Sequence, residues 1–510
     1  MGTTDSTGLV IAFPFRAAGG ARQMWANAVA GDDAYNGLSP YPGYRMNGTG
    51  PQYQYGATGP GVADPAYGPK QTYAGTVSYQ AQNEGCQYFF PEGQSFVIDD
   101  NNFNAKSCGF SIQYPTCMQS YDPADPLNVN KHGRAGLPGR GARPILLRGD
   151  GGMPSAGRGD DVEYSNWVFR GLVFRSPSPQ TFVKTSFVAC QNNLLIENCI
   201  YDNVQPIFDN NNPYPGKEIS YNVIFRRNTS YGQWDDTEHA CGIHSKHTWL
   251  TVEDCVFWHN GWKVGVTRDE PVATGGPDIF KHCCYITNGF GTVTLFRRNV
   301  MIDGSAGGMS MRGSHTAYNN VIIDCPTPEI KSGGVKSDNA NPNGVDQKSW
   351  SNLIVNTSPI NSRLPRATGF ACSGGTPNSI CYWSLWVNNT GRGGPNNYWI
   401  QVMSNTTTVE THAKFKGNRA YDWASDDRRI VKALQSPGVL EHIYIDEDED
   451  NLIFDQSPAT TEQLYATAGF ASKQDMIDAM IADPMQDWAY KLQQAASQLF
   501  NHDFSRVYTG

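Results

Sequence analysis

The middle of the chain repeats a short pattern of apolar positions. Each copy has a few alternating apolar residues, then one small or polar residue, then a second apolar run. The copies are WVFRGLVFRS, LLIENCIYDN, VIFRRNTSYG, LTVEDCVFWHNG, TLFRRNVMIDG and HTAYNNVIIDC. The small or polar position holds Gly171, Cys199, Asn228, Cys255, Asn299 and Asn320, at spacings of 28, 29, 27, 44 and 21 residues. SWSNLIVNTS, with Asn352, continues the series 32 residues later.

This period predicts an all-β fold, a coiled parallel solenoid. Short alternating runs are typical of strands, and one coil cannot bury its inner face without neighbours, so equivalent positions should stack. Stacked asparagine side chains can hydrogen-bond along such a ladder, and cysteine or glycine fits the same tight turn. The interval of 44 residues predicts either a long loop or a further coil around DIFKHCCYITNG. The alternative is a β-sandwich with coincidental spacing.

Several segments resemble right-handed parallel β-helix proteins. GDDAYNGLSP at 31–40 resembles their opening segment, and CQYFFPEGQSF, GRGARPILLRGDGG and NWVFRGLVFRS follow in the order of their first coils. AGGMSMRGSHTAYNNVIID resembles a later coil, so the resemblance covers roughly residues 25–360. It implies a right-handed, pectate-lyase-like solenoid. This group includes polysaccharide lyases, some glycoside hydrolases and phage tailspikes, so fold alone does not decide the function.

The pattern changes at both ends of the chain. Long Gly-, Tyr-, Pro- and Asn-rich segments interrupt 41–142. Residues 1–142 are therefore expected to form a loop-rich N-terminal region and the start of the solenoid. Coils are expected over 143–400, and an α/β cap over 401–510. Helical periodicity in TTEQLYATAGF, SKQDMIDAMIADP and PMQDWAYKLQQAASQLF predicts helices there, one of them starting at Ser472. We expect these helices to cap the open end of the solenoid, where bare strand edges would pair with other chains.

Composition and charge exclude several classes of protein. With 53 Gly, 31 Pro and only 17% charged residues, short strands joined by turns are favoured over helical bundles. A net charge of −9 argues against nucleic acid as a partner. No apolar run reaches membrane-spanning length, and the N-terminal segment lacks a basic region, so we expect neither membrane insertion nor Sec export.

Two further features of the sequence are its cysteines and a run of acidic residues. The twelve cysteines contain no CxxC pair, so a zinc ribbon is excluded, and most are expected to be reduced and buried. Cys372 and Cys381 could close a short loop in an oxidising setting. The acidic run at 446–450 predicts a solvated turn, with a cation site as the alternative.

Polar side chains gather just before three of the repeat positions, in GIHSKH (242–247), DIFKHCC (278–284) and GMSMRG (308–313). Neighbouring strands of a sheet are about 4.8 Å apart, so these segments would form one stripe if they lie in successive coils. The sequence therefore predicts a polar, partly basic groove. Its members would be His244, Lys246, Lys281, His282 and Arg312, with Asp235, Asp236, Glu238 and Asp278 at the rim.

Such a groove suits two kinds of glycan chemistry. A lyase needs a base near the C5 proton of a uronate and a cation, either an arginine or a metal such as Ca²⁺, to neutralise its carboxylate. A hydrolase needs two carboxyl groups at a defined separation. The catalytic candidates are His244, Lys281, His282, Arg312, Asp278 and Glu238. Equally, these histidines and acids could serve only to satisfy backbone groups in turns.

Tryptophans are concentrated in the same region, with four of the twelve between 233 and 262. Alternation from the Cys255 position predicts that Trp258 points inward. Trp234, Trp249 and Trp262 lie at turns or strand starts and are expected to face outward, where aromatic rings can stack on the faces of sugars. The predicted substrate-binding residues are these three tryptophans with Lys246, Asp235 and Asp236.

Three functions follow from these patterns. The first is a virion-surface, tailspike-like protein, made in the host cytoplasm, that recognises and depolymerises a bacterial surface polysaccharide. The second is a structural decoration or fibre protein without catalysis, and the third a secreted polysaccharide lyase. The expected partners are the polysaccharide, other virion proteins and, by resemblance to tailspikes, two further copies of the chain in a homotrimer.

Overall fold

The computed structural model is mostly β-structure, organised in two compact units. Unit 1 comprises Met1–Pro177, Ser186–Ile200 and Asn212–Ile224, and unit 2 comprises Ser178–Thr185, Tyr201–Asn211 and Phe225–Gly510. The described residues are 22–35, 38–40, 42–46, 60–66, 69–77, 86–98, 116–126, 141–149, 164–178, 182–187, 191–209, 219–235, 239–278, 280–287, 292–332, 346–357, 369–373, 378–387, 399–404, 410–423, 430–434 and 440–509.

Unit 1 contains two parallel sheets and one short antiparallel pair. The first sheet has the order β1-β4-β6-β8-β11 and the second the order β5-β7-β9, while β2 pairs with β3. The bounds are β1 (Arg22–Trp25), β2 (Tyr44–Met46), β3 (Pro60–Ala63), α1 (Tyr73–Val77), β4 (Cys86–Pro91), β5 (Ser95–Ile98), β6 (Thr116–Tyr121), β7 (Ile145–Arg148), β8 (Tyr164–Arg170), β9 (Val173–Arg175) and β11 (Gln191–Glu197). β10 (Val183–Phe187), β12 (Ile200–Asp202) and β14 (Ser220–Arg226) contain residues assigned to both units.

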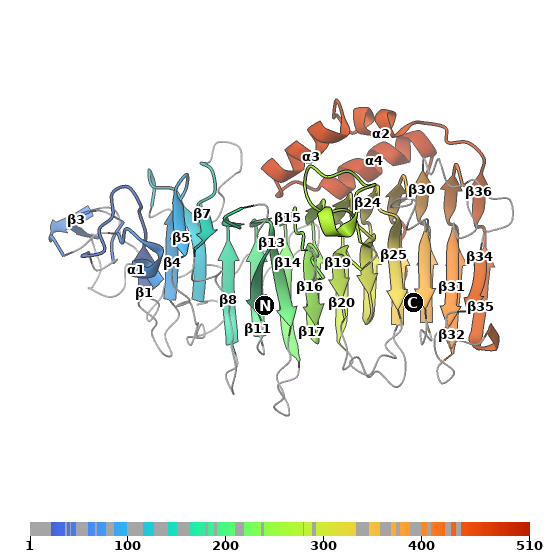
Figure 1. Ribbon diagram of the computed structural model, residues 1–510, viewed down its shortest axis with the longest axis horizontal. Helices are drawn as coiled ribbons and strands as arrows, with labels where there is room; N and C mark the ends of the chain where they lie inside the picture. Colours follow the sequence, from blue (N-terminus) through green and yellow to red (C-terminus); the bar gives the residue numbers. More distant parts are fainter. Residues whose placement is uncertain are drawn as a thin grey trace. The chain divides into compact units, whose positions relative to one another are not determined.

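Unit 2 is built from coils that contribute one strand to each of three parallel sheets (Figure 1). The sheet orders are β13-β16-β19-β22-β25-β28-β31-β34, β17-β20-β23-β26-β29-β32-β35 and β15-β18-β21-β24-β27-β30-β33-β36. The bounds are β13 (Val204–Asp209), β15 (Thr229–Tyr231), β16 (Ile243–Lys246), β17 (Thr248–Glu253), β18 (Val256–Trp258), β19 (His282–Ile286), β20 (Val293–Arg297), β21 (Val300–Ile302), β22 (Gly307–Met311), β23 (Ser314–Tyr318), β24 (Val321–Ile323), β25 (Thr327–Ser332), β26 (Asp346–Trp350), β27 (Leu353–Val355), β28 (Phe370–Ser373), β29 (Asn378–Tyr382), β30 (Leu385–Val387), β31 (Ile400–Ser404), β32 (Thr411–Lys416), β33 (Arg419–Tyr421), β34 (Ile430–Leu434), β35 (Ile443–Glu449) and β36 (Leu452–Phe454).

The repeated polar position forms the predicted ladder. The side-chain oxygen of Asn299 accepts from the backbone N–H of Cys255, and Asn320 and Asn352 do the same for the next coils at 3.0 and 2.8 Å. Ser384, Asn418 and Asn451 extend the ladder to the last coil. The residue before this position has a positive φ in coil after coil: Asp254, Arg298, Asn319, Ser351, Trp383, Gly417 and Asp450. This left-handed residue bends the chain between two sheets, and the ladder satisfies the polar groups that the bend buries.

Aromatic rings fill the inside of the unit 2 coils. Phe225, Phe257 and Phe296 stack in successive coils at centroid distances of 6.4 and 6.3 Å. Phe257 is therefore the inward residue of β18. Trp258, which alternation was expected to place inward, packs instead against the apolar cluster on the outer face. The prediction was wrong because Trp258 is an odd number of residues from Cys255, so simple alternation places it with Val256 on the outer face and Phe257 on the inner one.

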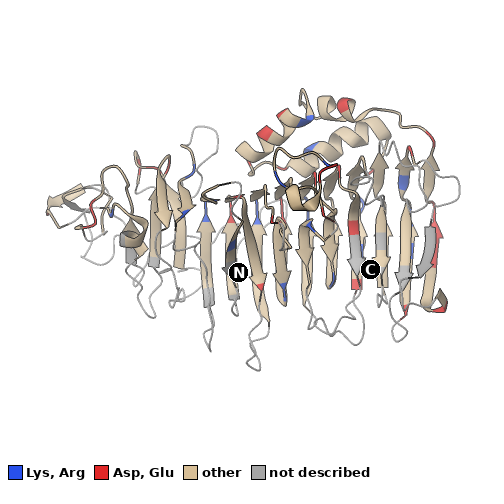
Figure 2. Ribbon diagram, in the orientation of Figure 1, with Lys and Arg blue, Asp and Glu red and all other residues tan. Residues whose placement is uncertain are grey.

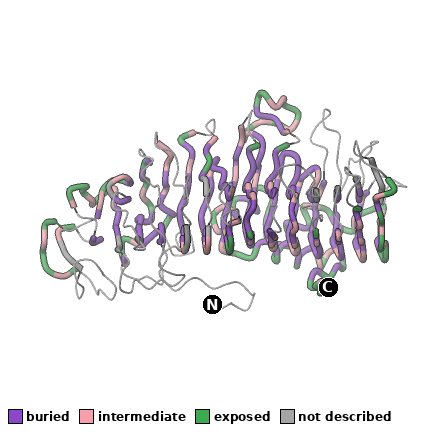
Figure 3. Tube along the Cα trace, turned by 90° about the horizontal axis from the view of Figure 1, so that it is seen from below, coloured by how far each residue is buried: buried purple, intermediate pink, exposed green. Residues whose placement is uncertain are grey.

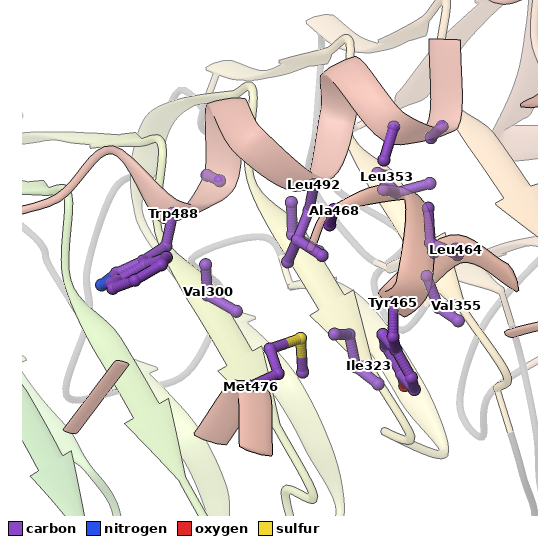
Figure 4. Close-up of a cluster of buried hydrophobic side chains, with 14 of the residues drawn as sticks. Val300, Ile323, Leu353, Val355, Leu464, Tyr465, Ala468, Met476, Trp488 and Leu492 are labelled. Carbon is purple, nitrogen blue, oxygen red and sulfur yellow. The ribbon is translucent and has the colours of Figure 1, made fainter. Parts of the chain in front are cut away.

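Three helices cover the outer face of one sheet (Figures 1 and 4). They are α2 (Thr461–Thr467), α3 (Lys473–Ala482) and α4 (Trp488–Phe500), and the predicted start at Ser472 is confirmed by its side chain, which accepts from the N–H of Asp475. Apolar residues of β18, β21, β24, β27, β30 and β33 pack against them, among them Val300, Ile323, Leu353 and Val355.

The helices were expected to cap the open end of the solenoid, and this placement is wrong. They lie along a lateral face instead, because that face carries two outward apolar side chains per coil, which the helices shield from water.

Two further expectations can be compared with the structure. Nine cysteines in the described part of the chain are free and buried, Cys372 and Cys381 among them. Residues 446–449 of the acidic run lie in strand β35 rather than in a turn, and Asp450 lies at the bend that follows. Figure 2 shows acidic residues on this strand. Its carboxylates pair with the neighbouring strand, as in the Lys416–Glu449 ion pair of 2.7 Å.

Burial follows the coils: Figure 3 shows buried strands with exposed residues mainly at turns. None of the helices in the described part of the chain is long and apolar enough to cross a membrane.

Candidate functional site

Tyr285 lies at the centre of a group of aromatic and cationic side chains on one sheet of unit 2. Its ring stacks with those of His244, His282 and His239 at centroid distances of 5.6, 5.7 and 5.9 Å. The guanidinium of Arg312 lies over the same ring at 5.3 Å. We call these five residues the Tyr285 cluster.

The register of the sheet creates this cluster. His244 of β16 is directly opposite Tyr285 of β19, and Tyr285 is opposite Ser310 of β22. Arg312 follows β22, and its backbone N–H donates to the carbonyl of Ile286 at 2.8 Å. The three segments that the sequence predicted to be neighbours are therefore neighbours. Strand pairing thus brings Tyr285 close to His244, 41 residues earlier in the chain, and to Arg312, 27 residues later.

Two histidines of the cluster are held neutral. Burial, helped by nearby His239, Lys246 and Lys184, lowers the pKa of His244 to about 4. Burial and the adjacent Arg312 and His239 lower the pKa of His282 to about 3. At neutral pH both imidazoles are uncharged, so each has one nitrogen able to accept a proton.

Two polar atoms in the cluster can still form hydrogen bonds. Nδ1 of His282 and Nε of Arg312 are buried and have no hydrogen-bond partner among the described residues. Buried polar atoms are normally satisfied, so exceptions at a cluster of titratable groups point to a ligand or water. The cluster therefore offers one cation, neutral proton acceptors and an aromatic ring on the same face.

Lys281 does not line the cluster as expected. Its side chain is buried, and its ammonium group donates to the main-chain carbonyl of Asp235 and lies 3.8 Å from a carboxylate oxygen of Asp278. Asp278 is itself tied to Ser305, which receives its N–H at 2.6 Å. These residues fix the loop after β18, which explains why a lysine is buried there: its charge is compensated on both sides.

The other predicted residues divide into four groups: exposed, buried, half-buried and outside the described residues. Trp249 is 43% exposed, as expected for an outward ring. Trp262 is buried, stacked on His259 at 4.1 Å with its indole N–H donated to Asp303, so the expected exposure there is wrong. The guanidinium of Arg268, from the same loop between β18 and β19, lies over this ring at 5.6 Å.

Trp234 is half-buried, with the ammonium of Lys263 5.6 Å from its ring. Lys246 is half-buried on β16, opposite Asp209. Asp236 and Glu238 lie outside the described residues.

Sequence reasoning missed Tyr285 and His239. Tyr285 lies three residues beyond His282 in KHCCYIT, a segment recognised as having coil character but not assigned a register. Aligning that segment as a coil would have placed Tyr285 beside His244. Phe280, 63% exposed and 6.1 Å from the ring of His239, was missed as well and adds an aromatic edge to the cluster.

The described residues contain no group of three or more His, Cys, Asp and Glu side chains arranged to hold a metal ion. The three histidines of the Tyr285 cluster are stacked by their ring faces, whereas metal ligands point their nitrogens at a common centre. Calcium, considered above for neutralising a uronate, thus finds no such ligand group in this part of the chain.

Comparison with known proteins gives little beyond this geometry. No family model matches the chain, and no curated protein matches it. Among solved structures, the chain is similar to a selenomethionine derivative of GH136 lacto-N-biosidase from Eubacterium ramulus, with 10% identity, a TM-score of 0.26, and 85% of this chain and 68% of that chain covered. At that TM-score the likeness carries no argument about function.

Proposed function

We propose that this protein is a virion-surface, tailspike-like protein whose Tyr285 cluster binds an acidic bacterial surface polysaccharide. The observation that carries the proposal is the cluster itself: Arg312, three histidine rings and Tyr285 on adjacent parallel strands and the segments that flank them. The resemblance of residues 25–360 to right-handed parallel β-helix proteins that act on glycans supports it.

The chemistry of the cluster favours a sugar that carries a carboxylate. An arginine pairs with a carboxylate through a planar fork of donors, and the tyrosine ring offers a flat surface for C–H groups of a sugar. Neutral imidazoles add acceptors and donors for hydroxyl groups. The five side chains come from strands β16, β19, β22 and their flanks, so a chain of sugars would run across the strands.

Replacing Arg312 tests this proposal. We expect Arg312→Ala to weaken binding of a uronate-containing capsular polysaccharide by about tenfold or more, because a charge-assisted hydrogen bond contributes about 1.5–3 kcal/mol. Binding is measured by biolayer interferometry on immobilised polysaccharide, with thermal unfolding as the check on folding. Lys348→Ala is the matched control, since its cation also lies over a tyrosine ring, that of Tyr508, outside the cluster.

Unchanged binding in Arg312→Ala would contradict the proposal, as would binding that fails for every acidic polysaccharide offered. In the second case the alternative of a structural decoration or fibre protein would be favoured.

A homotrimer belongs to the tailspike proposal, and light scattering on the purified protein would give the mass of one or three chains.

The neutral histidines favour a second, catalytic step. With His244 or His282 as base and Arg312 on the uronate carboxylate, the C5 proton would move to the imidazole and the C4–O bond would break. The imidazolium would then give that proton to the leaving glycosidic oxygen, which becomes a hydroxyl group. The elimination leaves a C4–C5 double bond and a new reducing end, with no water consumed. A hydrolase would require a carboxyl pair instead, and the Tyr285 cluster contains no carboxylate.

Ultraviolet absorbance distinguishes the two reactions, because only elimination produces an unsaturated uronate. We expect absorbance to rise with wild-type protein and an acidic substrate, and to stay flat with His244→Ala. Cleavage without absorbance would identify hydrolysis. Binding without any cleavage would restrict the protein to recognition.

A further inference from the structure

Helix α4 borders a polar hollow in unit 2. One face of the helix packs on the sheet through Trp488, Leu492 and Phe500. Next to it lies a hollow of about 400 Å³, lined by Tyr490, Gln494 and Ser497 of the helix, by the segment 501–505 and by Asn319 at the bend before β24. Binding sites for small molecules typically measure about 300–1,000 Å³, so its size is sufficient for a small ligand.

The walls of the hollow are held in place without a ligand. The amide nitrogen of the buried Gln493 side chain donates to the carbonyl of Ser351 at 2.9 Å. Nε2 of His502 lies 2.8 Å from the carbonyl of Trp383. Asn501 ends α4 in a left-handed conformation, and its carbonyl accepts from Arg419 at 3.0 Å. A preformed site loses little conformational entropy on binding.

The groups facing the hollow are mainly uncharged. Oδ1 of Asn319 is buried and has no hydrogen-bond partner among the described residues. Gln494 and Ser497 add an amide and a hydroxyl, which can both donate and accept. The single carboxylate, Asp503, already accepts from the backbone N–H and hydroxyl of Ser505 at 2.9 and 2.6 Å. The ring of Tyr490 is 57% exposed beside these groups.

We propose that this hollow is a binding site for a neutral sugar, separate from the Tyr285 cluster. Amides and hydroxyls that both donate and accept match the hydroxyl groups of a sugar, and an exposed phenol ring matches its apolar face. An anionic ligand is disfavoured by Asp503, and an apolar ligand would leave Asn319 Oδ1 unsatisfied. The site stands independently of the acidic-polysaccharide proposal, since it shares no residue with it.

Saturation-transfer NMR tests this site with glucose, galactose, N-acetylglucosamine and N-acetylgalactosamine as probes. We expect transfer to at least one of them with wild-type protein. Tyr490→Ala should weaken that sugar's binding by about tenfold, the effect of losing one ring contact. Ser497→Phe should abolish it by filling the hollow. Tyr490→Ala decides the matter if Ser497→Phe fails to fold, because the Tyr490 ring is mostly exposed.

Arg312→Ala serves as the control and should bind the neutral sugar like the wild type. This separates the two sites, because loss of acidic-polysaccharide binding alone would leave the hollow unaffected. The inference is overturned if none of the four sugars receives saturation. It is also overturned if transfer persists undiminished in a folded Tyr490→Ala variant.

Discussion

The buried asparagine ladder determines how each coil of unit 2 turns. Asn320 accepts from the backbone N–H of Asn299 at 3.0 Å and donates to the carbonyl of Phe296 at 3.1 Å. It also donates to Asn352 Oδ1 at 3.1 Å, so one side chain satisfies groups of three coils. A single residue at this position therefore decides whether several buried polar groups have partners.

We expect Asn320→Ala to lower the free energy of unfolding by about 2–3 kcal/mol, because it leaves buried polar groups without partners. Asn320→Ser is the matched variant, since Ser384 occupies the equivalent position in a later coil and accepts from the N–H of Asn352. Its cost should be clearly smaller. Urea unfolding followed by circular dichroism measures both, and equal losses would contradict the role assigned to the side-chain oxygen.

At the scale of elements, helix α3 is attached to the coils by an ion-pair network as well as by apolar packing. Lys473 lies 2.8 Å from Asp303 and 2.5 Å from Asp324, two residues with positive φ at successive bends. Arg268, from the loop after β18, also reaches Asp303, at 3.2 Å. The loop and the helix thus share the same two bends.

Removing the lysine should loosen the helix. We expect Lys473→Met to cost about 1–3 kcal/mol, a value between those of exposed and buried pairs, since two partly buried carboxylates lose their partner. Thermal unfolding gives the loss, and limited proteolysis should cut the region of α2–α4 sooner. Adding Asp324→Asn to the lysine variant should recover part of the stability. No recovery would indicate that Lys473 contributes through packing alone.

At the scale of the whole molecule, buried histidines link stability to pH. Burial lowers the pKa values of His244, His282, His259 and His502. The histidines of the unfolded chain bind protons near pH 6.5. In the folded protein the pKa is about 4 for His244 and His502 and about 3 for His282, and it is also lowered for His259. Stability should therefore be highest above pH 6.5 and fall as the pH drops from 6.5 towards 4.

His502→Gln tests this pH dependence. Glutamine can still donate to Trp383, so the melting temperature at pH 8 should change little. At pH 4 the variant should be more stable than the wild type by up to about 3 kcal/mol, the value of a pKa lowered from 6.5 to about 4. Calorimetry from pH 8 to pH 4 measures this, and a parallel pH profile would contradict it.

His412→Gln is a control with the opposite sign. Burial lowers the pKa of His412, but hydrogen bonds to Glu410 and Asp446 outweigh that effect and raise it. This histidine stabilises the fold below pH 6.5, and that contribution disappears as the pH rises through its folded pKa. Its replacement should therefore steepen the loss of stability in acid.

The sequence by itself determined the repeat. A period set by Asn299, Asn320 and Asn352 is local information, because every coil must place the same small polar residue at the same bend. It also predicted that His244, His282 and Arg312 would be neighbours, because each lies in a segment before a repeat position and strand pairing places such segments side by side.

Tertiary structure decided the rest. The contact of Tyr285 with His244 depends on the register between β16 and β19. The burial of Lys281 and Trp262 depends on how the loop between β18 and β19 packs against the coils. The position of α2–α4 depends on which face of the coils carries exposed apolar side chains. Periodicity fixes which residues are equivalent, but long-range packing decides which of them water can still reach.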